Sequence, residues 1–269
     1  MSQSLLKLDQ VTIQFGGLTA VSNLDLAIGN REMVGLIGPN GAGKTTAFNL
    51  ITGVYQPTAG SIEFSGRPIA GLKAHELTKL GVARTFQNIR LFGSLSVLDN
   101  VRAATQLHRS HGVINALWRG RAFRESEKEV RSFVMDLLAI FKLDGCAEEE
   151  AKSLPYGDQR RLEIVRALAT KPKLLLLDEP AAGMNPTEKD ALMHLIRFIQ
   201  EKFQISILLV EHDMKVVMGI CERIAVLEYG VKISEGTPAE IQSDPRVIKA
   251  YLGTEDDEDD ENNGEVAHA

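Results

Sequence analysis

The chain has 269 residues, of which 44% are hydrophobic, 36 are acidic and 30 are basic. This size and apolar fraction are typical of a globular protein with a sizeable core. The net charge of −6 comes from the C-terminus, because residues 255–261 and Glu265 carry eight negative charges and the rest carries +2. A nearly neutral body gives no electrostatic reason to expect nucleic-acid binding.

Other features of the whole chain argue against a membrane-spanning, a secreted or a disulfide-rich protein. No stretch approaches the ~18–20 apolar residues that a membrane span requires, and residues 1–4 lack the basic-then-apolar order of a secretion signal. The two cysteines, Cys146 and Cys221, lie far apart without metal-ligand spacing. They favour a reducing compartment and no disulfide framework.

The predicted elements begin with strands. Residues 6–15 nearly alternate between apolar and polar, with one slip at 9–10, which predicts a strand with a bulge or two strands. Clean alternation over 24–28 predicts the next strand, and the apolar run at 33–37 predicts a buried one. Another short strand is expected at 62–64.

A glycine-rich motif follows the buried strand. The sequence GPNGAGKTT fits GxxxxGK[ST] at every fixed position, and a helical pattern follows it, as the motif requires. In such a loop, successive N–H groups and a helix N-terminus face phosphate oxygens. Lys44 is expected to reach the β- and γ-phosphates of ATP, and the Thr45 hydroxyl to bind Mg²⁺. The alternative, an ordinary glycine-rich turn, is disfavoured by the complete match. The predicted phosphate-binding residues are Gly38, Pro39, Asn40, Gly41, Ala42, Gly43, Lys44, Thr45 and Thr46.

From about Leu95, the spacing of the apolar residues changes from the alternation of strands to that of helices. Residues 96–99 resemble a capping box that opens a helix, and apolar residues between 130 and 141 recur at helical spacing. A further helix is expected after Gly157. These helices predict a helical subdomain over about 88–165.

Strands and helices then alternate to the end of the folded region. Branched apolar runs at 174–177, 205–210 and 224–227 are joined by helical patterns, which implies a mainly parallel sheet covered on both faces. The expected fold is an α/β P-loop NTPase core over 5–252, with an N-terminal antiparallel β portion and the helical subdomain inserted. Residues 253–269 are expected to be an acidic disordered tail.

Two buried strands end in ionisable residues. Ligands in open α/β sheets lie beyond the carboxyl ends of strands. Asp178 is therefore expected to hold Mg²⁺, and Glu179 to orient or deprotonate the water that attacks the γ-phosphate. His212, after the next strand, is expected to donate a hydrogen bond to the γ-phosphate. The alternatives are a carboxylate that caps a turn and a structural histidine.

At this point the chain resembles the ATPase subunits of ABC transporters. The motifs GPNGAGKTT, RTFQN, YGDQRRLEIVRAL, LLLLDEPAAGMNP and VEHDM have the order and spacing of that family over about residues 5–252. Within it, the chain is most similar to branched-chain amino-acid importer ATPases of the LivG type. That similarity rests on Tyr156-Gly157, on residues 181–186, on residues 211–214 and on the ending from Gly236 to Gly253.

The resemblance implies roles for residues outside the phosphate loop. Phe15 would stack on adenine, with a plain core residue as the alternative. Gln87 would touch Mg²⁺ or the attacking water and act in catalysis, with a solvated loop residue as the alternative. Arg90, Leu91 and Phe92 would lie near a groove for a permease helix, although simple core packing competes with that interpretation.

The segment Tyr156, Gly157, Asp158 and Gln159 corresponds to the family signature LSGGQ. Starting a helix, it would face the γ-phosphate of ATP held by a partner subunit. Pro155 stands in place of serine and Asp158 in place of glutamine, so weaker ATP binding is expected there. Asn185 replaces the usual aspartate of the loop after Glu179, which puts a contact across the dimer in doubt.

The resemblance also implies a setting. It implies a peripheral ATPase at the cytoplasmic face of the inner membrane, with a second ATPase subunit, two permeases and, indirectly, a periplasmic binding protein. The cargo would be a branched-chain amino acid. The alternatives are a lipopolysaccharide-export or urea/amide-import ATPase, a soluble ABC protein acting on nucleic acid, and a regulatory nucleotide sensor. The basic segment 109–131 is interpreted as a solvated helical face, with anionic lipid or a permease loop as the sharper alternative.

Overall fold

The structure is a computed structural model that describes residues 4–108 and 121–251. It divides into two compact units, one formed by residues 1–74 and 176–269 and the other by residues 75–175. The predicted tail at 253–269 and the first part of the basic segment lie outside the described residues.

The first unit contains an antiparallel sheet with the order β2-β1-β4-β5. Its strands are β1 (Leu6–Phe15), β2 (Leu18–Ile28), β4 (Ala59–Phe64) and β5 (Arg67–Pro68). The slip expected at 9–10 is a bulge within one strand: the β1–β2 register shifts between Leu8 and Val11, and Gln10 has a φ of 48°. The antiparallel β portion is confirmed.

A mainly parallel sheet forms the centre of the same unit, in the order β10-β9-β3-β8-β7. Strand β3 (Met33–Ile37) pairs in parallel with β8 (Ser206–Val210) and β9 (Arg223–Glu228), and β10 (Val231–Gly236) runs antiparallel to β9. Every residue of β3, β7 (Leu174–Asp178) and β8 is buried, as expected for strands covered on both faces. The boundary between the units falls within β7.

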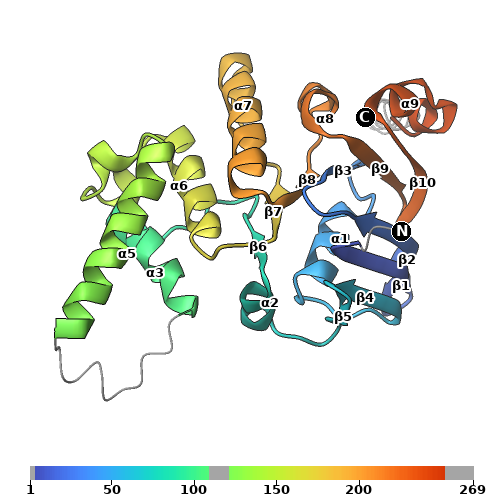
Figure 1. The fold of residues 1–269 in the computed structure, drawn as a ribbon. Coiled ribbons are helices and arrows are strands. Elements are labelled where there is room, and N and C mark those ends of the chain that lie inside the picture. Colours follow the sequence, from blue (N-terminus) through green and yellow to red (C-terminus); the bar gives the residue numbers. More distant parts are fainter. Residues whose placement is uncertain (1–3, 109–120, 252–269) are drawn as a thin grey trace, which may run out of the picture. The chain divides into compact units, whose positions relative to one another are not determined.

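Helices cover this sheet. They are α1 (Lys44–Ile51), α7 (Pro186–Phe203), α8 (Met214–Ile220) and α9 (Pro238–Ser243). In Figure 1, α8 and α9 lie above the sheet, while α1 and the antiparallel sheet lie below it. At the start of α7, the Asn185 side chain accepts a hydrogen bond from the Glu188 N–H, and Glu188 accepts one from the Asn185 N–H. Asn185 therefore has a local role as a helix cap.

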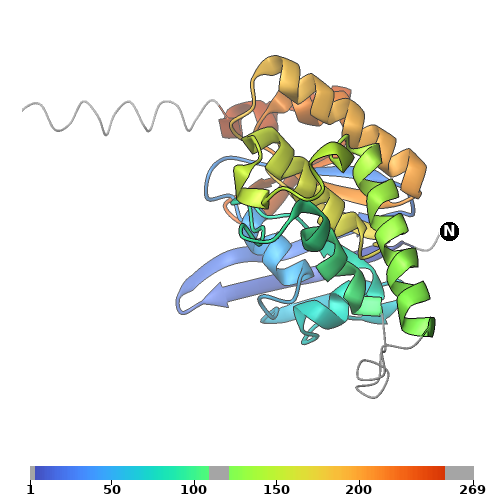
Figure 2. The same ribbon diagram turned by 90° about the vertical axis from the view of Figure 1, so that its left-hand side faces the viewer.

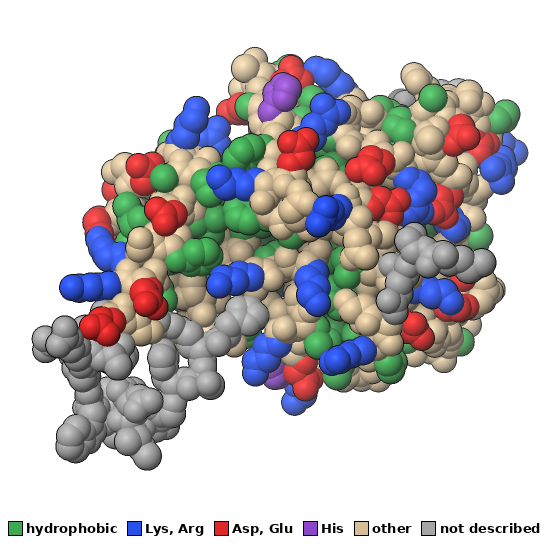
Figure 3. All heavy atoms as spheres, viewed as in Figure 1, with side chains coloured by type: hydrophobic (Ala, Val, Ile, Leu, Met, Phe, Trp, Pro, Cys, Tyr) green, Lys and Arg blue, Asp and Glu red, His purple; other side chains and the backbone are tan. Residues whose placement is uncertain are grey.

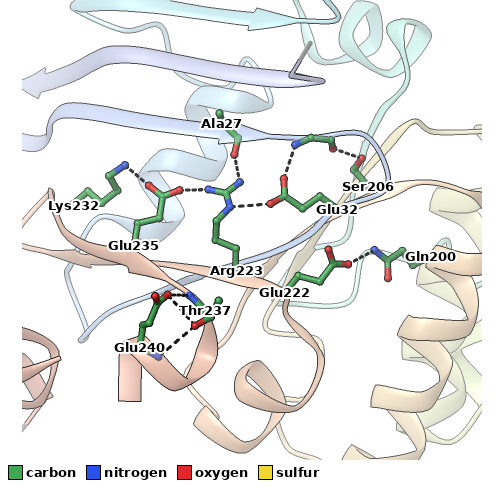
Figure 4. Close-up of polar contacts among 11 residues, drawn as sticks. Ala27, Glu32, Gln200, Ser206, Glu222, Arg223, Lys232, Glu235, Thr237 and Glu240 are labelled. Carbon is green, nitrogen blue, oxygen red and sulfur yellow. Dashed lines mark hydrogen bonds and ion pairs between the residues drawn. The ribbon is translucent and has the colours of Figure 1, made fainter. Parts of the chain in front are cut away.

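A polar network centred on Arg223 joins the two sheets of the first unit (Figure 4). Its guanidinium donates to Glu32 at 2.8 Å, to the Ala27 carbonyl at 2.5 Å, and to Glu235. Burial alone would raise the pKa of Glu32, but hydrogen bonds from Arg223 and the Gly29 N–H lower it. The network thus ties β2 and the turn before β3 to β9 and β10.

The second unit is mainly helical. It contains α2 (Ala74–Leu80), β6 (Val82–Arg84), α3 (Val97–Thr105), α5 (Arg121–Ile140) and α6 (Tyr156–Leu168), with short 3₁₀ turns at Gln106–His108, Asp144–Cys146 and Ala151–Ser153. In Figures 1 and 2, α3, α5 and α6 gather into one bundle. Their shared core includes Val101, Val134, Leu138 and Leu162. Ser96 caps α3 by accepting the Asp99 N–H at 3.0 Å.

One boundary differs from expectation. The helix expected after Gly157 begins at Tyr156, with Pro155 in an extended conformation at its N-cap. The first turn of α6 therefore includes both Tyr156 and Gly157.

The surface carries both signs of charge. On the face drawn in Figure 3, the blue basic and red acidic side chains are interspersed. Within residues 4–108 and 121–251, no helix has the length and apolar character needed to cross a bilayer.

Candidate nucleotide-binding and catalytic site

The predicted phosphate loop runs from the end of β3 to the start of α1. Gly38, Gly41 and Gly43 have φ values of 150°, 76° and 96°. A Cβ on Gly38 would lie 2.1 Å from the Leu227 carbonyl oxygen of β9, and one on Gly43 would lie 2.7 Å from the Ala20 carbonyl oxygen of β2. Glycine is required at both positions because the loop passes directly over neighbouring backbone.

Replacing Gly38 by alanine tests this close approach. Gly38→Ala is expected to lower the free energy of unfolding by about 3 kcal/mol, because backbone must move to admit the methyl group. Gly17→Ala is the matched control, since a Cβ there meets nothing within 4 Å. Urea unfolding of both variants measures the difference, and equal midpoints would contradict the steric argument.

Lys44 lies inside the loop. Its ammonium donates to the carbonyl oxygens of Gly38 at 2.6 Å and Pro39 at 2.8 Å, and the side chain is buried. Burial lowers the pKa of Lys44, and the negative charges of Glu179 and Asp178 oppose that shift. The first turn of α1 adds N–H groups without intrahelical partners and partial positive charge. This combination fits a polyphosphate.

Both strand-end carboxylates lie beyond β7. Asp178 is buried at the last position of the strand. Glu179 adopts a left-handed φ of 46° and donates its N–H to the Val210 carbonyl at the end of β8. This conformation is uncommon outside glycine and marks a constrained position.

His212 comes close to Glu179. Its Nδ1 lies 3.8 Å from Glu179 Oε2, and its side chain is 62% exposed. The fold therefore brings together Lys44, Asp178, Glu179 and His212 of the first unit, through the charge interactions and contacts described. This juxtaposition of strand ends is the one that the sequence predicted.

The carboxyl group of Glu211 lies close to His212, and the sequence alone did not assign it a role. Glu211 is fully buried, its Oε1 accepts the Ala181 N–H at 2.7 Å, and its Oε2 lies 3.9 Å from His212 Nδ1. Burial raises the pKa of Glu211. On the other side of His212, Asp213 caps α8 and pairs with Lys189 of α7 at 2.6 Å. A run of three ionisable residues after a buried strand was the available signal.

The oxygen donors of the first unit suit Mg²⁺. Asp178 offers a carboxylate and Thr45 a hydroxyl, which are hard ligands that this ion prefers. Among the described residues, no group of three or more His, Cys, Asp or Glu side chains could hold a metal ion alone. Few protein ligands are expected where Mg²⁺ is shared with substrate phosphates.

Phe15 lies at the end of β1 and is 45% exposed. Its ring meets that of Tyr55 edge-on, with centroids 5.0 Å apart and an interplanar angle of 71°. Phe15 is therefore not a core residue. Tyr55, which follows α1, was not singled out from the sequence.

The remaining predicted residues belong to the second unit. Gln87 is exposed in the segment after β6. In the first turn of α6, Tyr156 is exposed, Asp158 pairs with Arg161 at 3.1 Å, and Gln159 donates to the Leu154 carbonyl at 2.8 Å. A Cβ on Gly157 would meet nothing within 4 Å, so no neighbour within the chain demands this glycine.

The second unit also contains a groove of about 460 Å³. Two of the three residues predicted to lie near a permease groove, Arg90 and Phe92, line it, together with Phe86, Ala103, Ala104 and Arg166. The Arg90 guanidinium lies 4.2 Å from the Phe86 ring centroid, and that of Arg166 lies 5.6 Å from the Phe92 centroid. The lining is largely apolar and aromatic, with cationic groups over the rings, and it also includes the Glu163 carboxylate.

The phosphate loop, the strand-end carboxylates and the histidine on one parallel sheet define the class of P-loop ATPases. Comparison with known proteins narrows this class. The ABC transporter family matches residues 21–182, and the family described as branched-chain amino acid ATP-binding cassette transporter matches residues 231–257.

Individual relatives agree. The chain is 45% identical to the high-affinity branched-chain amino acid transport ATP-binding protein BraF of Pseudomonas aeruginosa, over 94% of this chain and 99% of the relative. It is 46% identical to LivG of Salmonella typhimurium, over the same shares of the two chains. Among solved structures, the ADP conformation of the ATP-binding cassette MJ1267 matches with a TM-score of 0.80 and 27% identity, covering 93% of this chain and 99% of that one.

The chain therefore belongs to the ABC transporter family, as the sequence motifs suggested. It is an ATP-binding subunit whose hydrolysis of ATP is coupled to transport, so it works with membrane transporter components.

Proposed function

We propose that this chain binds Mg-ATP on the loop at residues 38–46 and hydrolyses it with Glu179 as the general base. The observation that carries the proposal is the distance of 3.8 Å between His212 Nδ1 and Glu179 Oε2. In the adjoining loop, the negative charges of Glu179 and Asp178 raise the pKa of Lys44 against the effect of burial. Glu179 would orient or deprotonate the attacking water, and His212 would donate a hydrogen bond to the γ-phosphate.

The other first-unit residues and Gln87 complete the proposed site. Asp178, Thr45 and Gln87 are the proposed ligands of Mg²⁺, which when bound neutralises phosphate charge in the transition state. Phe15 would stack on adenine, and its exposed ring supports this role.

The first turn of α6 is proposed to bind the nucleotide of a second ATPase subunit. The exposed Tyr156 and the unobstructed Gly157 support a surface that a phosphate approaches from outside the chain. Pro155 offers no hydroxyl, and Asp158 adds a negative charge that its ion pair with Arg161 offsets in part.

The double change Pro155→Ser with Asp158→Gln is expected to tighten ATP-driven dimerisation. Each change adds a hydrogen-bond donor near the phosphate, and the second also removes repulsion, so a gain of about 10-fold is expected from about 1.5 kcal/mol. Analytical ultracentrifugation in ATP, with the Glu179→Gln background to prevent turnover, measures the dissociation constant. An unchanged constant would argue against the proposed weakness.

The partners are proposed to be two permeases, a second ATPase subunit of related type and, indirectly, a periplasmic binding protein. Branched-chain amino acids are the proposed cargo, and the cytoplasmic face of the inner membrane is the proposed location. The names of the relatives and the match at residues 231–257 support this setting. The groove with Phe86, Arg90 and Phe92 supports docking of a permease helix. On the face drawn in Figure 3, the interspersed charges give no support to a nucleic-acid partner.

Reconstitution tests the whole proposal. The chain is expected to co-purify with two membrane permeases, and the complex in vesicles should hydrolyse ATP faster when binding protein and leucine, isoleucine or valine are added. Stimulation by DNA or RNA instead would favour the soluble alternative. Stimulation by lipopolysaccharide would reassign the transport class.

A further inference from the structure

Arg160, in the second turn of α6, is a buried arginine with a demanding set of partners. Only 4% of the residue is exposed. Its Nη1 donates to the Phe86 carbonyl at 2.8 Å, and its Nη2 donates to the Gln87 carbonyl. Its Nε and Nη2 also donate to the Tyr156 hydroxyl, at 3.1 and 2.9 Å. One guanidinium thus holds two successive main-chain carbonyls and the side chain that opens α6.

Glu163, three residues further along α6, accepts hydrogen bonds from backbone N–H groups of residues 86–90. It is 2% exposed, and its Oε1 accepts the N–H groups of Phe86 at 3.4 Å and Arg90 at 3.3 Å. Its other oxygen lies 3.6 Å from Arg160 Nη1. The two side chains therefore bind both carbonyl and N–H groups of the segment 86–90.

Arginine suits this place better than any other cation. Its planar fork presents five donors in fixed directions, so three acceptors can be held at once. Buried ion pairs add little net stability once desolvation is counted, so a contribution to stability alone does not explain why these acceptors are gathered.

We propose that Arg160 is a positioning residue that makes the main chain at Gln87 and the first turn of α6 move as one piece. The hydrogen bond to the Gln87 carbonyl restricts the direction in which the Gln87 side chain leaves the backbone. The hydrogen bonds to the Tyr156 hydroxyl fix the start of α6. The inference rests on the proposed role of Gln87 in ATP hydrolysis. It adds that Arg160 acts through Gln87 and touches neither nucleotide nor metal.

A double-mutant cycle on the full-length chain tests this action. Steady-state MgATP hydrolysis is measured for Gln87→Ala, Arg160→Gln and the double variant. Arg160→Gln is expected to lower kcat about 10-fold with KM within about 2-fold, since misplacement of a catalytic group mainly affects the transition state. The double variant should match Gln87→Ala, because the Gln87 side chain through which Arg160 acts is then absent. Arg131→Gln is the matched control: Arg131 lies in α5, and its ion pair with Glu148 is exposed.

Each outcome separates the inference from the function it rests on. If Gln87→Ala lowers kcat but the two losses multiply in the double variant, Arg160 acts independently, and the inference fails while the proposed function stands. If Gln87→Ala leaves kcat unchanged, the role of Gln87 itself is wrong and the inference falls with it.

Two conservative variants keep the test decisive if Arg160→Gln does not fold. Arg160→Lys retains the charge but not the fork, and Tyr156→Phe removes only the hydroxyl acceptor. Both are expected to unfold cooperatively on heating and to lower kcat, with Arg160→Lys the more affected. Wild-type kcat in a folded Arg160→Lys variant would overturn the proposal, because charge alone would then suffice.

Discussion

Glu179→Gln is expected to reduce ATP turnover by about 10²–10⁴-fold, the usual contribution of general base catalysis. The amide has nearly the same shape as the carboxylate but cannot accept the proton of the attacking water. ATP binding should persist, because the variant keeps Lys44 and the loop around it.

Phosphate release under single-turnover conditions, with ATP binding measured separately by titration calorimetry, separates the two effects. Glu201→Gln is the matched control, since it makes the same change at an exposed position of α7. Equal turnover in Glu179→Gln and the parent chain would reject the base assignment. A parallel loss of binding and turnover would show that Glu179 supports the loop instead.

Lys44→Ala is expected to weaken ATP binding by about 10²-fold, because a hydrogen bond to a charged group contributes about 1.5–3 kcal/mol. The Lys44 side chain is already buried within the loop, so part of the free energy of removing its ammonium from water is spent on folding and not on ATP binding. Loss of the ammonium removes the only side-chain cation that the described contacts place in the loop at residues 38–43.

The dissociation constant for ATP measures this change, with Lys215→Ala as the control because Lys215 pairs at the surface of α8. An unchanged dissociation constant for Lys44→Ala would remove the loop from the nucleotide site. Retained affinity together with lost turnover would limit Lys44 to the transition state.

Features encoded in short stretches could be predicted from the sequence. The phosphate loop was predicted because its glycines, lysine and threonine are consecutive, and local backbone geometry follows from residue type. Asp178, Glu179 and His212 were predicted because each follows a buried apolar run, and parallel strands end at a common edge. The bulge in β1 was visible as a break in alternation.

Contacts between distant segments could not be predicted in the same way. Arg160 bonds to carbonyls more than 70 residues earlier in the chain, and Glu211 accepts an N–H from Ala181, 30 residues away. Arg223 likewise meets Glu32 across 191 residues. Each pairing depends on which elements pack together, and residue type alone does not specify that.

The sequence by itself therefore determined the class of fold, the nucleotide loop and the strand-end groups, because hydrophobic period and local motif encode them. Only the tertiary structure decided which buried charges support those groups. A buried arginine or glutamate is tolerated only where folding supplies its hydrogen-bond partners, and those partners are brought together by packing rather than by proximity in the chain.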